Sequence, residues 1–319
     1  MTTAIETQGL ARRFGKEVAV AGVNLLVPEK AVYGFLGQNG AGKTTTIRLL
    51  LGLLRPTAGT ARIFGLDVDR SRREAARLVG ALVETPCHYD HLTGRENLAI
   101  TRRLLGAQKN EIDRVLETVD LTYAADRRVG GYSLGMRQRL GVARALIGKP
   151  RMLLLDEPTN GLDPHGILDM RKLIGTLPER EGVTMFVSSH ILAEVEHTAT
   201  HVGLMHKGRL LLQSRVADLR ARQTKTVRLK VDRPSDTIAL LRTVGIVSTL
   251  HEQDYVLVTS TSSEAAAREM PAINFMLVEH GIRVSALEVE QPSLEDIFLR
   301  TVDRVRPDAD EPLPLALAA

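Results

Sequence analysis

The chain has 319 residues, of which 44% are hydrophobic and 25% are charged. This is the composition of an ordinary soluble globular protein with material for one large domain or two modest ones. Aromatic residues make up only 3% and Trp is absent, while the formal net charge is +4. A base-stacking platform or a concentrated basic surface for nucleic acid is therefore not expected.

Cysteine content and hydropathy indicate the cellular compartment in which the protein is expected. Cys87 is the single cysteine, which excludes an internal disulfide and fits a reducing compartment. The chain does not begin with a basic-then-apolar leader, and no uninterrupted apolar run reaches the ~18 residues of a membrane span. We expect a cytoplasmic protein that reaches the inner face of the cell membrane only through a partner.

The first 30 residues are predicted to form two strands joined by a turn. The strands are Ala4–Thr7 and Val18–Val27, and Phe14 lies in the connection. On this segment alone Phe14 could pack at a hairpin corner or stack on a bound base. Most aromatic side chains are structural, which favours the packing role at this point.

A glycine-rich loop follows the predicted strand Ala31–Leu36 and leads into a helix. Strand, glycine turn and helix in this order are the setting of a phosphate-binding loop, because glycine lets several N–H groups approach an anion at a helix start. Lys43 would meet the β and γ phosphates, and the Thr44 hydroxyl would hold Mg²⁺. The segment predicts binding of ATP or GTP. The nucleotide-binding residues expected are Gly37, Gln38, Asn39, Gly40, Ala41, Gly42, Lys43, Thr44 and Thr45.

Residues 93–130 are predicted to form a helical insert. Thr93 followed by Glu96 has the spacing of a capping box, and a second helix is expected over about Lys109–Val119. Beyond the insert, Ser133 is placed to cap a long amphipathic helix that ends near Gly148.

A continuous apolar strand, Arg151–Leu155, ends in two carboxylates. Asp156 is placed to complete the Mg²⁺ site of a phosphate loop, and Glu157 to take the proton from an attacking water. The alternative is a salt-bridged acidic pair without a chemical role.

The remaining elements predict two domains and a tail. Strands and helices alternate up to about residue 213, which indicates a parallel α/β sheet with ligands at the carboxyl ends of its strands. We expect an α/β phosphate-loop NTPase core with an antiparallel β subdomain and the helical insert in residues 1–222. Residues 223–305 would form a small α+β domain whose final helix begins at Pro292. The proline-containing end, residues 306–319, is predicted to be disordered.

Five segments together resemble the ordered motif set of ABC-transporter ATPase subunits. They are the phosphate loop, Tyr132–Met136 before an Arg-Gln-Arg run, Leu155–Pro158, Gly161–Asp163 and Ser189-His190. The resemblance covers roughly residues 3 to 215, and the segment around Ser133 separates this family from other phosphate-loop proteins. It implies an ATP-hydrolysing subunit, with ATP and Mg²⁺ as cofactors, that energises a separate transmembrane permease.

The same resemblance implies a second ATPase subunit, in the simplest case an identical chain. Two such domains close head to tail around two ATP molecules, so that the phosphate loop of one chain meets Ser133 and Gly135 of the other. His190 would contact the γ-phosphate and orient the water, and Asp163 would lie at the dimer seam. Phe14 would then stack on the adenine.

Two departures from the family pattern indicate a branch. Where most members have a glutamine that reaches Mg²⁺ and senses the permease, this chain has Glu84, whose carboxylate would bind Mg²⁺ directly. Leu134 and Met136 replace the commoner glycine and glutamine. These features and the segment 290–298 resemble the bacitracin and lantibiotic exporters, which implies outward transport of an antibiotic, peptide or other amphipathic compound.

Two other classes of function are considered. Non-transport ABC-type ATPases that act on nucleic acid or the ribosome usually carry a long coiled coil or two ATPase domains. In this chain about ninety residues separate the phosphate loop from Ser133, and each motif occurs once, so no direct nucleic-acid contact is expected. A phosphate-loop kinase would leave the segment around Ser133 unexplained.

Overall fold

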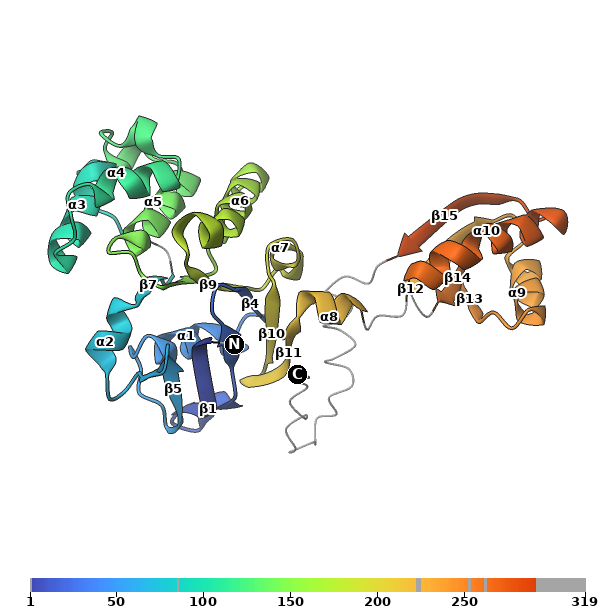
Figure 1. Cartoon of the computed structure of the whole chain (residues 1–319), viewed down its shortest axis with the longest axis horizontal. Helices are drawn as coiled ribbons and strands as arrows, with labels where there is room; N and C mark the ends of the chain where they lie inside the picture. Colours follow the sequence, from blue (N-terminus) through green and yellow to red (C-terminus); the bar gives the residue numbers. More distant parts are fainter. Residues whose placement is uncertain (1, 85, 222–224, 252–253, 261–262, 291–319) are drawn as a thin grey trace. The chain divides into compact units, whose positions relative to one another are not determined.

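The computed structural model describes residues 2–84, 86–221, 225–251, 254–260 and 263–290 (Figure 1). These residues divide into two compact units, one ending at Val216 and the other beginning at Ala217. The helix predicted from Pro292 and the tail predicted at 306–319 lie outside the described ranges.

The first unit is built on a six-stranded sheet in the order β11-β10-β4-β9-β8-β7. From β10 to β7 every neighbouring pair is parallel, and β11 is antiparallel to β10. The carboxyl ends of the parallel strands therefore meet at one edge of the sheet. The strands are β4 (Val32–Leu36), β7 (Val79–Leu82), β8 (Met152–Asp156), β9 (Thr184–Ser189), β10 (His201–His206) and β11 (Arg209–Arg215).

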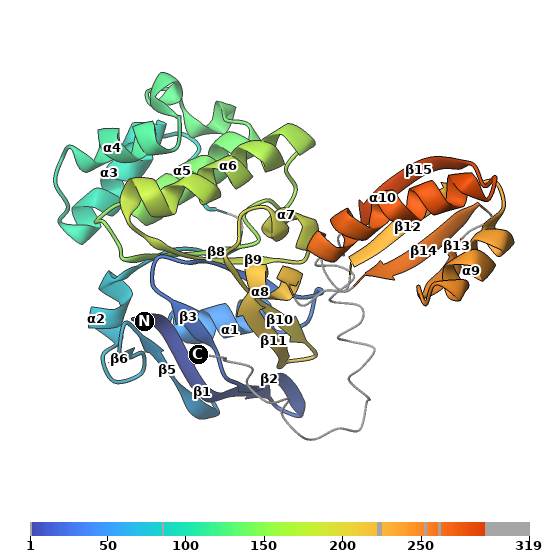
Figure 2. The same cartoon turned by 45° about the vertical axis from the view of Figure 1, so that its right-hand side comes forward.

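Both faces of this sheet are buried, as the uninterrupted apolar composition of β8 predicts. Leu153 and Leu155 pack into a cluster with helices α3 to α6, whereas Met152 and Leu154 pack into another with α1 and the N-terminal strands. Figure 2 shows these helices above the sheet and α1 below it. The helices are α1 (Lys43–Leu50), α2 (Arg72–Arg77), α3 (Gly94–Leu105), α4 (Glu111–Thr118), α5 (Leu134–Leu146), α6 (Pro164–Glu181) and α7 (Leu192–Glu196), with short 3-10 turns at Thr122–Ala124 and Val129–Gly131.

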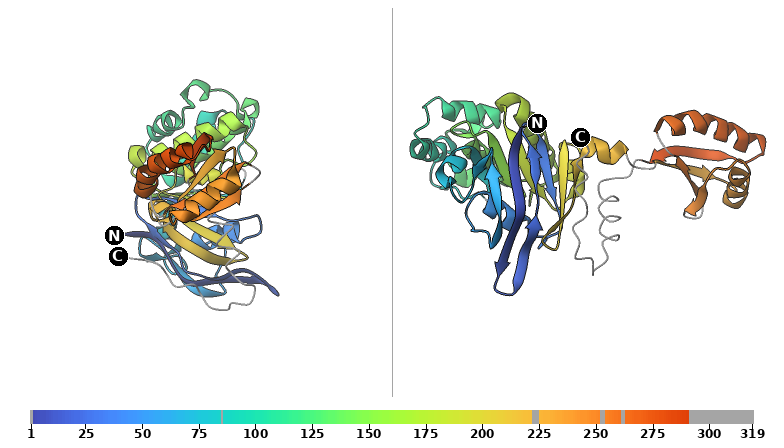
Figure 3. Two further views of the ribbon diagram at one scale, coloured as in Figure 1. Left: turned by 90° about the vertical axis from the view of Figure 1, so that its right-hand side faces the viewer. Right: turned by 60° about the horizontal axis from the view of Figure 1, so that its bottom comes forward.

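An antiparallel sheet covers the α1 side. Its order is β2-β1-β5-β6, and β3 pairs with the other end of β1. The β1–β2 hairpin is the long dark-blue ribbon in Figure 3. The strands are β1 (Thr3–Phe14), β2 (Glu17–Val23), β3 (Leu26–Pro28), β5 (Ala58–Ile63) and β6 (Leu66–Asp67).

The prediction of a single strand over Val18–Val27 is wrong, because the structure has two strands there, β2 and β3. The hydroxyl of Thr7 on β1 donates to the Val23 carbonyl at 2.8 Å and accepts from the Leu25 N–H at 2.7 Å. This side chain takes the place of a regular backbone ladder at the break. The two short strands β2 and β3 thus pair with different parts of the long strand β1.

Two predicted helix caps are confirmed. The Thr93 hydroxyl accepts from the Glu96 N–H at 3.1 Å, and the Glu96 carboxylate accepts from the Thr93 N–H at 2.7 Å, which is a complete capping box. The Ser133 hydroxyl accepts from the Met136 N–H at 3.2 Å. These caps fix where α3 and α5 begin.

An ion-pair network joins α4 of the helical insert to the C-terminal end of α6. The Arg114 guanidinium pairs with Glu111 at 2.6 Å and with Glu181, and it donates to the Leu146 carbonyl at 3.0 Å. Burial alone would raise the pKa of Glu111, but the hydrogen bond and charge of Arg114 outweigh it and hold that pKa below its ordinary value of 4.5. The network therefore stabilises the fold most when the Glu111 carboxyl is ionised.

Arg114→Ala is expected to lower the free energy of unfolding at neutral pH by an amount near the lower end of the ~3–5 kcal/mol range for breaking a buried pair. A lowered carboxyl pKa gives stability that is present above the unfolded-state pKa and lost as the pH falls through the folded-state value. The difference between parent and variant should therefore shrink below about pH 4.5. Urea unfolding across this pH range measures it.

Lys149→Gln is the matched control for this prediction. Its ammonium also approaches Glu111, at 3.7 Å, but it is exposed, so its loss should cost less than about 1 kcal/mol. An Arg114→Ala variant as stable as Lys149→Gln at neutral pH would contradict the role given to the network.

The second unit contains a four-stranded antiparallel sheet in the order β13-β14-β12-β15, with α9 and α10 packed on one face through Leu241, Ile273 and Leu277. Within 223–305, the range predicted as a small α+β domain, the described residues form four strands and two helices. Helix α9 has no side-chain N-cap to mark its start. The elements from the end of the first unit are α8 (Val216–Ala221), β12 (Lys225–Val231), α9 (Pro234–Thr243), β13 (Ser248–His251), β14 (Tyr255–Ser260), α10 (Ser263–Glu279) and β15 (Val284–Glu290).

Candidate active site

Four neighbouring strand ends carry the predicted site residues. The phosphate loop follows β4, His190 follows β9, and Glu84 follows β7. Asp156 is the last residue of β8, and Glu157 comes directly after it. In the sheet these strands lie side by side in the order β4, β9, β8, β7. Residues as far apart in the sequence as Gly37 and His190 are thereby brought to one edge, where α/β sheets bind their ligands.

The phosphate loop needs glycine at two close backbone approaches. A Cβ on Gly42 would lie 2.4 Å from the Ala19 carbonyl oxygen, and φ at this residue is +100°. A Cβ on Gly37 would lie 2.5 Å from the Met205 carbonyl oxygen. Gln38, Asn39 and Gly40 are exposed at the tip of the loop, whereas Thr44 and Thr45 are half-buried in the first turn of α1.

Lys43 is buried, with 6% of its side chain exposed, and its ammonium is held inside the loop. It donates to the Gly37 carbonyl at 2.6 Å and to the Gln38 carbonyl at 3.3 Å. The third contact is an ion pair of 3.1 Å with a carboxylate oxygen of Glu157. Two carbonyl oxygens and one carboxylate oxygen therefore hold the ammonium inside the loop.

Glu157 lies between Lys43 and His190. Its other carboxylate oxygen lies 2.7 Å from Nδ1 of His190. Since a carboxylate can only accept, Nδ1 carries the proton of this hydrogen bond. The backbone of Glu157 has φ +50°, a conformation that non-glycine residues rarely adopt and that is found at functional sites.

Asp156 is 4% exposed. The Ser188 hydroxyl on β9 donates to its carboxylate at 2.5 Å and accepts from the Glu157 N–H at 2.9 Å. Among the described residues, no cation forms an ion pair with Asp156. A buried carboxylate without a cation is costly, and carboxylate plus hydroxyl oxygens are the ligands that Mg²⁺ prefers. Asp156 and Thr44 therefore fit an Mg²⁺ ion bound together with nucleotide phosphates.

Glu84 forms an ion pair with the Arg48 guanidinium of α1. Its backbone has φ +64°. Leu82 of β7 pairs with Leu155 of β8, so Glu84 and Glu157 each stand two residues beyond a paired position, and both are left-handed. The two neighbouring strands thus end alike, each with a carboxylate that a cation of α1 holds.

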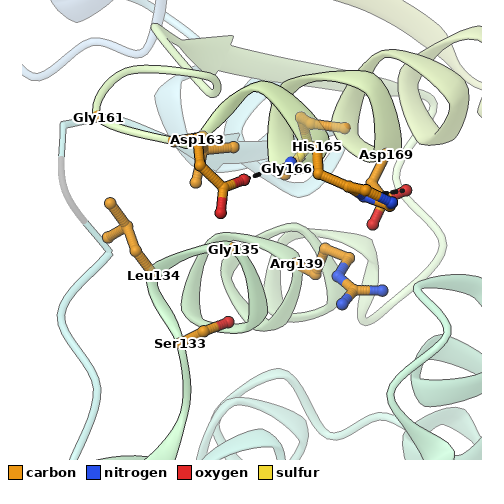
Figure 4. A pocket seen from close by; sticks show the side chains of 11 residues that line it. Ser133, Leu134, Gly135, Arg139, Gly161, Asp163, His165, Gly166 and Asp169 are labelled. Atoms are coloured by element: carbon orange, nitrogen blue, oxygen red, sulfur yellow. Dashed lines mark hydrogen bonds and ion pairs between the residues drawn. The ribbon is translucent and has the colours of Figure 1, made fainter.

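Ser133, Gly135 and Asp163 lie together in a separate pocket of about 380 Å³. Figure 4 shows Ser133 at the start of α5 and Asp163 at the start of α6, on either side of this pocket. The Asp163 carboxylate accepts from the Gly166 N–H at 2.7 Å and caps α6. The lining of this pocket contains no residue of the phosphate loop.

Phe14 ends β1 and is 45% exposed. The Arg12 guanidinium lies 4.6 Å from its ring centroid. The ring therefore lies at the β1–β2 hairpin outside the buried core.

Sequence reasoning missed two residues of this site, Ser188 and Arg48. Ser188 directly precedes Ser189-His190 at the end of the buried strand β9. Its place at a strand end is the feature from which the sequence could have predicted a role in the site. Arg48 stands one helical turn after Thr44, which places both on one face of α1.

A phosphate loop between β4 and α1, with a buried aspartate at the end of a nearby parallel strand, defines a phosphate-loop NTPase. A family model described as "ABC transporter" matches residues 20–160. Among solved structures, one described as the ATP binding subunit of an ABC transporter superposes with a TM-score of 0.61 at 26% identity, covering 68% of this chain and 92% of that one. The α/β NTPase fold predicted from the sequence is confirmed.

Curated relatives are similar along between two thirds and nearly all of the chain. The bacitracin transport ATP-binding protein BcrA of Bacillus licheniformis is 41% identical over 95% of this chain and 98% of its own length. The lantibiotic transport ATP-binding protein SrtF of Streptococcus pyogenes is 40% identical over 66% of this chain and 90% of its own. The chain belongs to the ATP-binding subunits of ABC transporters.

Membership of this family settles the class of activity. The protein binds ATP and hydrolyses it, and the hydrolysis drives transport through a membrane permease. Of the helices that the structure describes, none combines the length and apolar content that crossing a membrane requires.

Proposed function

We propose that Asp156, Glu157, Lys43 and His190 carry out Mg²⁺-dependent ATP hydrolysis in this subunit. The loop amides and Lys43 would bind the phosphates, and Thr44 and Asp156 would hold Mg²⁺, with Glu84 as a further oxygen ligand. When bound, the metal supplies charge stabilisation at the phosphates. Glu157 would take a proton from the attacking water, and His190 would orient Glu157 through their 2.7 Å contact.

The complete site is proposed to require two copies of the chain. Its support is one observation: the pocket with Ser133, Gly135 and Asp163 contains none of the phosphate-loop residues. Ser133 and the first N–H groups of the thirteen-residue helix α5 favour an anion, and Ser133 is exposed. We infer that this end of α5 receives the nucleotide of a second subunit, while Phe14 stacks on the adenine of its own.

The cargo is proposed to be a peptide antibiotic or a similar amphipathic compound that is moved outward. Two relatives of high identity are named for bacitracin and lantibiotic transport, and Glu84, Leu134 and Met136 depart from the commoner family pattern in the way that branch does. The subunit would act at the inner face of the cell membrane, held there by the permease.

Purification of the full chain together with the membrane proteins it holds tests this proposal. ATP hydrolysis by the purified complex in lipid vesicles is measured with and without bacitracin and a lantibiotic. The proposal expects at least one of these compounds to stimulate hydrolysis and to accumulate across the vesicle membrane. Complexes that respond to neither, but respond to a non-peptide cargo, would contradict the assignment of cargo and leave the ATPase intact.

A further inference from the structure

We propose that Arg48 is a positioning residue that holds the Glu84 carboxylate in the nucleotide-free protein and competes for it with Mg²⁺. The inference rests on the metal role proposed for Glu84 and adds a control on that role. It starts from the contact between the Arg48 guanidinium and the Glu84 carboxylate.

Helix α1 supplies one cation to each of two neighbouring strand ends. Lys43, its first residue, pairs with Glu157 after β8, and Arg48, in its last turn, pairs with Glu84 after β7. The Lys43 pair must change on nucleotide binding, because the ammonium is needed at the phosphates. Glu84 and Glu157 occupy equivalent places at the ends of their strands. We therefore infer that the Arg48–Glu84 ion pair also breaks when nucleotide and metal bind.

The position of Arg48 on α1 brings this pair close to the proposed metal site. Thr44 and Arg48 are four residues apart, and side chains at this spacing are neighbours on one helix face, with about 5–6 Å between Cβ atoms. Glu84 is therefore held by a side chain that starts one helical turn from the residue whose hydroxyl is proposed to bind Mg²⁺. In this proposal the Glu84 carboxylate can pair either with the Arg48 guanidinium or with Mg²⁺.

The negative charge of Glu84 needs a cation near the nucleotide phosphates. A neutral glutamine adds no charge beside a triphosphate, whereas a carboxylate repels it unless a cation is close. Arg48 offsets this charge when no metal is bound. The pair is also weak enough to exchange, since Glu84 is 61% exposed and Arg48 is 40% exposed, and exposed ion pairs shift an equilibrium by a factor of about five at most.

Mn²⁺ is the probe for the test, because its free concentration can be read by electron paramagnetic resonance. The full chain is saturated with a non-hydrolysable ATP analogue and titrated with Mn²⁺ as the parent, Arg48→Gln, Glu84→Gln and the double variant. Glu84→Gln should weaken Mn²⁺ binding. Arg48→Gln should tighten it by about two- to fivefold, but only when Glu84 is present.

Arg62→Gln, an equal loss of charge at an exposed site on β5, is the control and should leave Mn²⁺ affinity unchanged. If Arg48→Gln tightens binding equally with and without Glu84, Arg48 acts by its charge alone and the competition is overturned. If Glu84→Gln binds Mn²⁺ as the parent does, the metal role of Glu84 fails, and the inference fails with it. Matching melting temperatures confirm that all variants are folded.

Discussion

Glu157→Gln is expected to slow ATP hydrolysis by about 10²–10⁴-fold, the usual contribution of a general base. Glutamine keeps the size of the side chain and can still contact His190, but it cannot accept a proton from water. ATP affinity should stay near that of the parent, since the loop and Lys43 hold the phosphates. Steady-state phosphate release and equilibrium ATP binding separate the two effects.

Glu179→Gln, at an exposed site on α6, controls for the loss of one negative charge and should hydrolyse ATP at the parent rate. A Glu157→Gln variant with parent-like turnover would remove Glu157 from the role of base. In that case the contacts with Lys43 and His190 would be structural.

Lys43→Ala is expected to raise the dissociation constant for ATP by at least tenfold and to abolish measurable hydrolysis. A charge-assisted hydrogen bond contributes about 1.5–3 kcal/mol, and a 1.4 kcal/mol loss is a factor of ten. The change also leaves the Glu157 carboxylate, which is 19% exposed, with His190 as its one remaining side-chain partner in the described part of the chain. Binding of a fluorescent ATP analogue, together with phosphate release, measures both losses.

The comparison is with Lys172→Ala, which removes an exposed ammonium from α6 and should alter neither quantity. Parent-like ATP affinity in Lys43→Ala would mean that the loop amides alone bind the phosphates. The contacts of this lysine with Glu157 and with the loop carbonyls would then be structural.

Much of the core could be predicted because its signals are local. The glycines and Lys43 fall between a buried strand and a helix, and the run before Asp156 is apolar without interruption. Parallel strands bring their carboxyl ends to one edge, so residues at strand ends were expected to meet. The structure places Lys43, Glu157 and His190 in contact, as that reasoning requires.

Other features depend on contacts that a local pattern does not contain. The break between β2 and β3 follows from hydrogen bonds of Thr7 with residues 16 and 18 positions away. The contact of Ser188 with Asp156 spans 32 positions. The left-handed backbone of Glu84 and Glu157 is also invisible in the sequence, since the residues usual at positive φ are glycine, asparagine and aspartate.

The Glu84–Arg48 pair shows how one departure from a family pattern gains meaning from the structure. The sequence indicates only that a carboxylate replaces an amide near the expected metal. The contact with α1 shows that a cation in the same chain already balances this carboxylate.

Sedimentation of the Glu157→Gln chain with and without Mg²⁺ and ATP tests most directly whether the nucleotide lies between two subunits. We predict monomers without nucleotide and dimers with it. Adding Ser133→Arg should return the chain to monomers without changing the ATP affinity of the single subunit, because Ser133 lies outside the phosphate-loop site of its own chain. Monomers at saturating ATP, or dimers that persist with Ser133→Arg, would contradict the shared site.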